Sequence, residues 1–448
     1  MFKQILNKYM QGDKRTVLLK KNILGSFFIK GWTCLVQLLL VPVTLNCLNQ
    51  YEYGIWLTIN SLLIWIDSFD IGLGNGLRNR LAASIATNDV GRSRRQVSTA
   101  FFMLVLIILP TIVLFTGIIH HTDCYALLNV DRQTTQHLDS ILTISYIVVA
   151  TTFIFKFVGN VYMALQLPAI SNLLIAIGQT LSLVLIFVAS QFTTVTLLHV
   201  AVIYTASPLL VYLLSYPITF TKYKMLAPSI ALFDRTELRP LFGLGVKFFF
   251  IQIGGLIIFA SSNLLISRLF SPKEVTPYQI AHRYFGLVNI LFTIISAPLW
   301  SATTDAYMRK DWQWIRHTTR KMRKVMVATT TLLLVMAAIA HPVYTLWVGS
   351  EVEIPSAMSI AMMAYMVVVV YGTCYSNFIC GIGKIRLLTI ITVAEALVYI
   401  PLAVWLSQRY GVIGIVIALI LVNLVSAIVN HVQFSKLCNN TAKSIWNL

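Results

Sequence analysis

The chain has 448 residues, of which 57% are hydrophobic and only 11% are charged. Soluble domains contain about 25% charged residues, so this chain has too few charges to cover a folded surface in water. The composition therefore excludes a soluble globular protein and predicts an all-α polytopic membrane protein. The six cysteines show no C-x-x-C spacing and no clustering with histidine, which predicts packing residues and neither a metal site nor a cofactor.

Apolar stretches of about 20 residues, the length needed to cross a hydrocarbon core of ~30 Å, recur along the whole chain. They predict about 12 transmembrane helices, near residues 22–48, 52–74, 97–119, 138–162, 168–190, 195–220, 243–266, 277–302, 325–347, 357–381, 386–407 and 412–435. Ahead of them, MFKQILNKYM is expected to form a short amphipathic helix on the inner surface. No small-residue cleavage site follows it, so we expect this segment to remain on the mature chain.

Lysine and arginine gather in alternate loops. The basic loops include residues 78–95, 222–239 and 309–324, whereas the loops between them hold few basic residues. By the positive-inside rule, the basic loops and both termini are predicted to be cytoplasmic. This distribution explains the net charge of +18 without a nucleic-acid partner. The longest outer loop, near residues 120–137, leaves no room for an extramembrane catalytic domain, so we expect a protein that is not an enzyme.

The two halves of the chain begin in similar ways, which indicates a weak internal repeat. LGSFFIKG (24–31) resembles LGVKFFFIQIGG (244–255), and NDVGRSRRQVSTAF (88–101) has a basic counterpart in RKDWQWIRHTTRKM (309–322). Paired halves of this kind build a central site in many transporters. We therefore predict two six-helix bundles around a central cavity, with the domains 1–220 and 243–448 joined by a cytoplasmic linker at 221–242.

Polar residues recur at steps of three and four residues within several predicted helices, so they share one helical face. Such a face is expected to avoid lipid, and several stripes at the start of each half favour a hydrated cavity. The candidate cavity-lining residues are Asn22, Ser26, Gln37, Asn60, His282 and Asn289. Close helix packing with interhelical hydrogen bonds is the alternative that the stripes leave open.

Ionisable residues inside the predicted spans are mostly cations. A charge at a helix centre costs about 2.5–3.5 kcal/mol on insertion scales, so it usually faces a cavity or a partner. Lys30 lies deepest, while Lys156, Lys247 and Arg283 lie nearer the membrane surfaces, where their side chains can alternatively reach the headgroups. Glu395 is expected either to pair with one of these bases or to take part in proton coupling.

The stretch IWIDSFDIGLGNGLRNR (64–80) combines two aspartates, three glycines and two arginines. It lacks the βαβ context of a dinucleotide fingerprint, so we interpret it as the end of the second transmembrane helix. Asp67 and Asp70 then lie at the negative end of the helix dipole and need cationic partners. An ion-pair latch at the inner mouth is predicted, and a cation-coupling site is the alternative.

Four motifs carry a resemblance to a known family: YGIWLTINSLLIWIDSFDIGLGNGLRNRLA (53–82), APLWSATTDAYMRKDWQWI (297–315), YTLWVGSEVEIP (344–355) and GIGKIRL (381–387). They resemble the O-antigen and capsule oligosaccharide flippases of the multidrug/oligosaccharidyl-lipid/polysaccharide exporter superfamily. The resemblance implies a flippase of the bacterial inner membrane. Such a flippase moves an undecaprenyl-diphosphate-linked oligosaccharide from the cytoplasmic to the periplasmic leaflet by alternating access.

The resemblance also implies roles for individual residues. Cations in the cavity of such flippases receive the pyrophosphate; by position, Lys30 matches one in the first helix and Arg283 one in the eighth. Lysine at position 30 lacks the bidentate phosphate geometry of arginine. The implied partners are the lipid-linked substrate, membrane lipids, and the polymerase and glycosyltransferases of the same pathway.

Two other functions remain as alternatives. A cation-coupled multidrug exporter of the same superfamily needs an acidic cavity, whereas this chain has more intramembrane bases than acids. A membrane-embedded polymerase or ligase usually carries a large outer loop, which this chain lacks.

Overall fold

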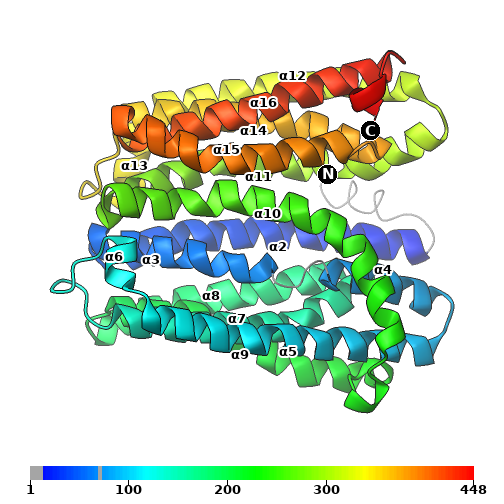
Figure 1. Ribbon diagram of the computed structural model, residues 1–448, viewed down its shortest axis with the longest axis horizontal. Helices are drawn as coiled ribbons and strands as arrows, with labels where there is room; N and C mark the ends of the chain where they lie inside the picture. Colours follow the sequence, from blue (N-terminus) through cyan, green and yellow to red (C-terminus); the bar gives the residue numbers. More distant parts are fainter. Residues whose placement is uncertain (1–13, 69–72, 448) are drawn as a thin grey trace, which may run out of the picture. The chain divides into compact units, whose positions relative to one another are not determined.

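The computed structural model describes residues 14–68 and 73–447. The chain divides into two units, unit 1 (Met1–Phe249) and unit 2 (Phe250–Leu448). Within the described ranges both units are built from helices joined by turns and short loops, without strands (Figure 1). The linker at 221–242 and the domain bounds 1–220 and 243–448, all inferred from the sequence, remain predictions.

Unit 1 contains long helices that contact both neighbours along the chain and helices distant in the sequence. Its elements are α2 (Lys14–Leu45), α3 (Gln50–Leu63), η1 (Ile64–Ser68), α4 (Leu73–Ala86), α5 (Val90–His121), α6 (Cys124–Leu128), α7 (Leu138–Ala164), α8 (Pro168–Phe192), α9 (Leu197–Lys222), η2 (Lys224–Leu226), η3 (Ile230–Leu232) and η4 (Arg235–Glu237). The most extensive contacts join α2 to α8 and α9 to both α7 and α8. The next helix, α10 (Leu238–Leu269), runs from unit 1 into unit 2.

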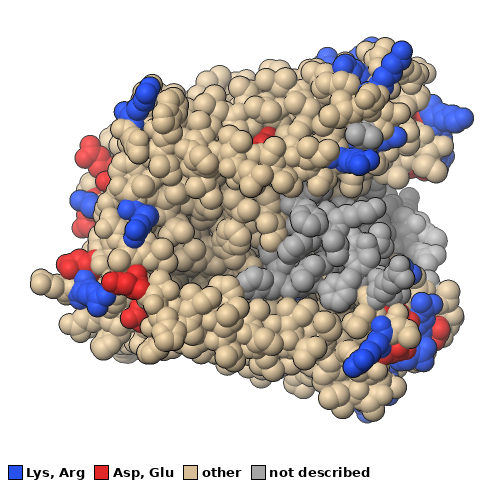
Figure 2. Space-filling view, in the orientation of Figure 1, with Lys and Arg blue, Asp and Glu red and all other residues tan. Residues whose placement is uncertain are grey.

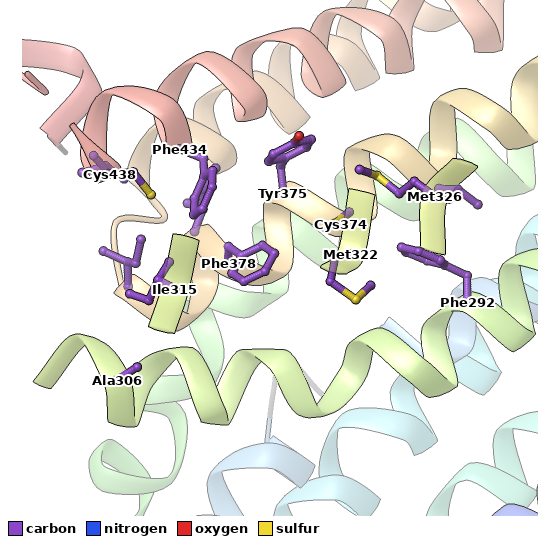
Figure 3. Packing of buried hydrophobic residues seen from close by; sticks show 14 residues of the cluster. Phe292, Ala306, Ile315, Met322, Met326, Cys374, Tyr375, Phe378, Phe434 and Cys438 are labelled. Carbon is purple, nitrogen blue, oxygen red and sulfur yellow. The ribbon is translucent and has the colours of Figure 1, made fainter. Parts of the chain in front are cut away.

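Unit 2 continues with helices that pack around α14. Its elements are α11 (Pro272–Met308), α12 (Trp312–Ala338), α13 (Ala340–Val348), α14 (Ser356–Ile382), α15 (Arg386–Tyr410), α16 (Val412–Cys438) and η5 (Ser444–Asn447). A buried cluster joins α11, α12, α14 and α16, with Phe378 and Phe434 packed ring against ring at 5.0 Å and Ile315 of α12 close by (Figure 3). This cluster fixes the face that α12 turns towards the rest of unit 2.

Eight helices of the described ranges are long and apolar enough to cross a membrane. They are α2 from Gly25, α5, α7, α8, α9, α14, α15 and α16. Figure 2 shows that the blue lysine and arginine side chains lie mostly towards the left and right edges of the view. The tan surface between them carries almost no charged side chains. These features confirm an all-α multi-pass membrane protein.

The other predicted spans fall on helical segments of a different kind. The window near 325–347 falls on α12 and α13, which meet at a bend of 68°, the geometry of a broken span or a re-entrant loop. Pro342, in the first turn of α13, has no N–H to continue the hydrogen-bond ladder of α12. The remaining three windows fall on α3 with η1, on α10 and on α11.

The segment that leads from α9 to α10 is docked along the first turns of α5. Thr99 accepts a hydrogen bond from the Asp234 backbone N–H at 2.9 Å, and Ser98 accepts one from Ser229 at 3.1 Å. Arg94 donates to the Ala227 carbonyl at 3.0 Å. The start of α5 therefore holds residues 227–237 in place by hydrogen bonds.

Candidate functional site

Helix α2 carries three of the predicted site residues with described side chains. Lys30 and Gln37 are exposed and Ser26 is half-buried. The hydroxyl of Thr33, on the same face, donates to the Ile29 carbonyl at 2.8 Å, so its polarity is satisfied within its own helix. The Ser26 Oγ is buried without a hydrogen-bond partner among the described residues. Local hydrogen bonds therefore satisfy some polar groups of this stripe, such as the Thr33 hydroxyl, but not the Ser26 hydroxyl.

Other predicted residues of unit 1 lie on α7 and α3. Lys156 is half-buried on α7, with its Nζ 6.0 Å from the centre of the Phe153 ring. Asn60 is half-buried near the end of α3. Both positions are compatible with either packing or a wet surface.

Four predicted residues stand where side chains are not described. Asp70 lies outside the described residues altogether, and Asn22, Asp67 and Lys247 lie in helices whose side chains there are outside the described part. The proposed ion-pair latch of Asp67 and Asp70 therefore stays a prediction.

In unit 2 the structure brings His282 of α11 into an aromatic and polar cluster. The His282 ring lies 6.2 Å from the Tyr278 ring and 6.4 Å from the Tyr365 ring of α14. The hydroxyl of the fully buried Tyr399 of α15 lies 2.7 Å from Ser262 Oγ of α10. Four helices thus contribute polar groups to the interior of unit 2.

Interhelical hydrogen bonds account for some polar residues near this cluster. Gln279 Nε2 donates to Asn263 Oδ1 at 2.7 Å, and Asn377 Nδ2 donates to Ser296 Oγ at 3.1 Å. By contrast, the Oδ1 of Asn289 is buried without a hydrogen-bond partner in the described ranges. The packing interpretation therefore holds for some polar residues of α11 and leaves Asn289 unexplained.

The intramembrane acid and the second predicted cation also lie in unit 2. Arg283 is half-buried on α11, beside His282. Glu395 of α15 is only 8% exposed, with Ser426 of α16 beside its carboxylate. Its Oε1 has no hydrogen-bond partner among the described residues, and no described lysine or arginine forms a salt bridge with it.

Outside the membrane-spanning segments, the loop before α7 contains an acid held in its charged form. The backbone N–H of Ala126 donates to Asp123, and Arg132 lies 2.9 Å from the same carboxylate. Together they lower the pKa of Asp123 below its ordinary value. A local hydrogen bond and an exposed ion pair thus hold this loop carboxylate in place.

Sequence reasoning missed the tyrosines around His282. Tyr278, Tyr365 and Tyr399 lie in apolar helical stretches, where aromatic residues usually serve as core packing. The only signal in the sequence is that Tyr278 stands one turn before His282.

No protein-family model matches the chain. It is 20% identical over 392 residues to a putative O-antigen export protein of Yersinia pseudotuberculosis, covering 86% of this chain and 88% of the relative. It is 20% identical over 403 residues to a putative O-antigen transporter of Salmonella typhimurium, covering 86% of this chain and 89% of the relative.

Solved structures share the fold. An inward-facing multidrug resistance MATE transporter of the MOP superfamily superposes with a TM-score of 0.76 at 15% identity, covering 91% of this chain and 95% of that one. An outward-facing conformation of such a transporter covers 97% and 98% of the two chains with a TM-score of 0.63 at 15% identity. The resemblance seen in the sequence is thereby confirmed: the chain is similar over most of its length to proteins named as O-antigen transporters, and it has the fold of MATE transporters of the MOP superfamily.

Proposed function

We propose that this membrane transporter is a flippase for a lipid-linked oligosaccharide. It would move an undecaprenyl-diphosphate-linked glycan from the cytoplasmic to the periplasmic leaflet of the bacterial inner membrane, with both termini cytoplasmic. The observation that carries the proposal is the match to proteins named as O-antigen transporters over most of the chain. The residues add support, because cations outnumber acids among the ionisable site candidates within the described spans.

The cations suit a diphosphate. Lys30 is exposed on α2, and Lys156 and Arg283 are half-buried on α7 and α11, whereas Glu395 is the buried acid. A diphosphate is the part of the substrate that most needs positive charge in a low-dielectric passage. In the proposed mechanism the glycan and diphosphate follow polar surfaces while the polyprenyl tail stays in lipid.

Two polar atoms favour a wet path over dry helix packing. The Ser26 Oγ and the Asn289 Oδ1 lie on the predicted polar stripes and have no hydrogen-bond partner in the described part of the chain. Buried polar groups are normally paired, so unpaired atoms on these faces agree with surfaces that meet water or a glycan during transport.

A charge series at Lys30 tests the proposal. Lys30→Arg should keep substantial transport, because it preserves the charge. Lys30→Ala should lose about tenfold or more, the scale expected when one charged hydrogen bond is removed, and Lys30→Glu should abolish transport by repelling the phosphates. The measurement is surface polysaccharide restored in a strain that lacks the gene, normalised to the amount of protein in the membrane.

The control is Lys321→Glu, an equal charge reversal at an exposed position of α12. It should leave transport unchanged. Wild-type transport by Lys30→Glu would remove Lys30 from the substrate path. A cation-coupled multidrug exporter is the second candidate, supported by the shared fold of the MATE transporters; restored drug resistance without restored polysaccharide would favour it.

A further inference from the structure

Unit 2 has a second concentration of positive charge, outside the predicted substrate path. A cavity of about 210 Å³ lies between α12 and α16. Arg316, Arg320 and Arg323 of α12 and His431 of α16 line it, and no acid is among its lining residues. Its volume is well above the roughly 10–15 Å³ that a single water needs by the same measure, so a phosphate group has room in it.

The cavity is positioned by the buried core beneath it. Phe434 and Cys438 belong both to the cavity wall and to the hydrophobic cluster (Figure 3). On α12, Ile315 and Met322 pack into the same cluster. Arg316 and Arg323 directly follow these two core residues, so packing of α12 holds the arginines at the rim of the cavity.

One of the three arginines has a structural partner. Arg316 donates to the Cys438 carbonyl at 2.6 Å, at the last residue of α16. A helix ends with a partial negative charge, and the guanidinium of Arg316 offsets it. The end of α16 therefore does not repel an anion in the cavity.

The charges of the other two arginines, Arg320 and Arg323, are not neutralised by a described salt bridge. Arg320 and Arg323 are exposed, and neither forms a salt bridge within the described residues. The two acids just before α12 are engaged locally: Asp305 pairs with Arg309 at 3.0 Å, and Asp311 accepts from the Trp314 N–H at 2.9 Å.

His431 adds an ordered polar wall. Its Nδ1 is hydrogen-bonded to the hydroxyl of Tyr371, and its ring lies 4.6 Å from the ring of Tyr375. When Tyr371 donates to Nδ1, the neutral imidazole carries its proton on Nε2 and is a hydrogen-bond donor there. In that tautomer the cavity combines guanidinium groups with a neutral donor.

The depth of the cavity points to a lipid ligand. Helix α16 is long and apolar enough to span the membrane and ends at Cys438, in the wall of the cavity. The end of a span lies at the level of the headgroups. Basic pockets between transmembrane helices bind anionic headgroups, and the planar fork of arginine matches phosphate oxygens.

We propose that the α12–α16 cavity binds the phosphate of a lipid headgroup from the surrounding leaflet. Arg320 and Arg323 contact the phosphate oxygens, and Arg316 keeps the end of α16 in place. Two lipids can present this chemistry: an anionic phospholipid and a polyprenyl diphosphate. The site does not depend on which substrate the protein transports.

Native mass spectrometry of the purified full chain tests the site. Each variant is titrated with phosphatidylglycerol and, separately, with undecaprenyl diphosphate. The double variant Arg320→Gln/Arg323→Gln should bind phosphatidylglycerol about tenfold or more weakly, which corresponds to about 1.4 kcal/mol. Since both side chains are exposed and without described ion-pair partners, the variant should fold normally.

The control is Lys321→Gln/Lys324→Gln, which removes the same charge from exposed positions of α12 that do not line the cavity. It should retain the affinity of the wild type. Weakened binding of undecaprenyl diphosphate alone in the arginine variant would support the site and identify the diphosphate lipid as its ligand. Equal affinities of the two double variants for both lipids would overturn the proposal.

Discussion

Glu237 is expected to be the main anchor of the segment that joins α9 to α10. It is only 7% exposed, and its carboxylate accepts hydrogen bonds from Arg92 Nε at 3.0 Å and Gln96 Nε2 at 3.1 Å. Gln96 is buried and in turn accepts from Ser84 Oγ at 2.9 Å. The change Glu237→Ala removes both acceptors and leaves the Nε2 donor of Gln96 buried without the acceptor that it has in the wild type.

The size of the loss follows from the two contacts. An unsatisfied buried donor costs about 1–3 kcal/mol, whereas the Arg92 side chain is 44% exposed and its ion pair contributes about 0–1 kcal/mol after solvent screening. We therefore expect Glu237→Ala to lose about 2 kcal/mol of stability. For a unit of this size, that lowers the apparent Tm by about 4–8 °C.

The assay is thermal unfolding of the purified protein in detergent, followed by intrinsic fluorescence. The matched control is Arg95→Gln, because Arg95 lies 3.8 Å from Asp234 in a neighbouring pair whose acid side chain is 30% exposed, against 9% for Glu237. It should change the Tm by less than about 2 °C. A wild-type Tm for Glu237→Ala, or an equal loss in the control, would refute the reasoning.

Three further tests have defined outcomes. Gly254→Ala should lower the Tm, because its added methyl would lie 2.8 Å from Thr392 Cγ2, whereas Gly255→Ala meets no atom within 4 Å and should raise stability by about 0.5–1 kcal/mol in a helix interior; equal Tm changes would contradict this pair. The hydroxyl and backbone N–H of Thr236, and then Arg95, lower the pKa of Asp234 from 3.8. The stabilisation from the charged Asp234 is present above pH 3.8 and is lost as the pH falls through the lowered pKa. Hydrogen exchange at 227–237, corrected for its intrinsic pH dependence, should therefore rise only as the pH falls below 3.8. In Asp234→Asn the corrected exchange should not change over the same pH range. Glu395→Gln should retain or raise the Tm, because it removes a buried carboxylate without a described base partner; a lower Tm would indicate an ion pair.

Hydropathy predicted most of the helices because it measures what the membrane requires. The spans near 168–190 and 412–435 fall on α8 and α16 almost end to end. The bend between α12 and α13 was missed although Pro342 was visible, because a proline in an apolar stretch is compatible with one kinked span or two helices. Only packing decides between them.

Charge patterns were less informative than hydropathy. In the sequence, Glu237 is one of several charged residues in a polar loop, and nothing predicts that it is buried. The fold buries it beside Arg92 and Gln96. The arginines of α12 were interpreted only as cytoplasmic charge, since the cavity arises where α16 packs beside them. Each of these features depends on segments more than 100 residues apart, and no local pattern encodes them.

The hydrogen bonds divide the predicted polar stripes into residues with different roles. The Thr33 hydroxyl is satisfied within its own helix and Ser296 by Asn377 of a neighbouring helix, so their polarity needs no water-filled path. Ser26 and Asn289 have buried oxygens without a partner among the described residues, and Lys30 is exposed. Because an unpaired buried polar atom costs about 1–3 kcal/mol, a chain selected only for stability would place alanine or leucine at positions 26 and 289. Contact of these atoms with water or substrate in another state of the transport cycle would offset that cost, as the proposed function expects.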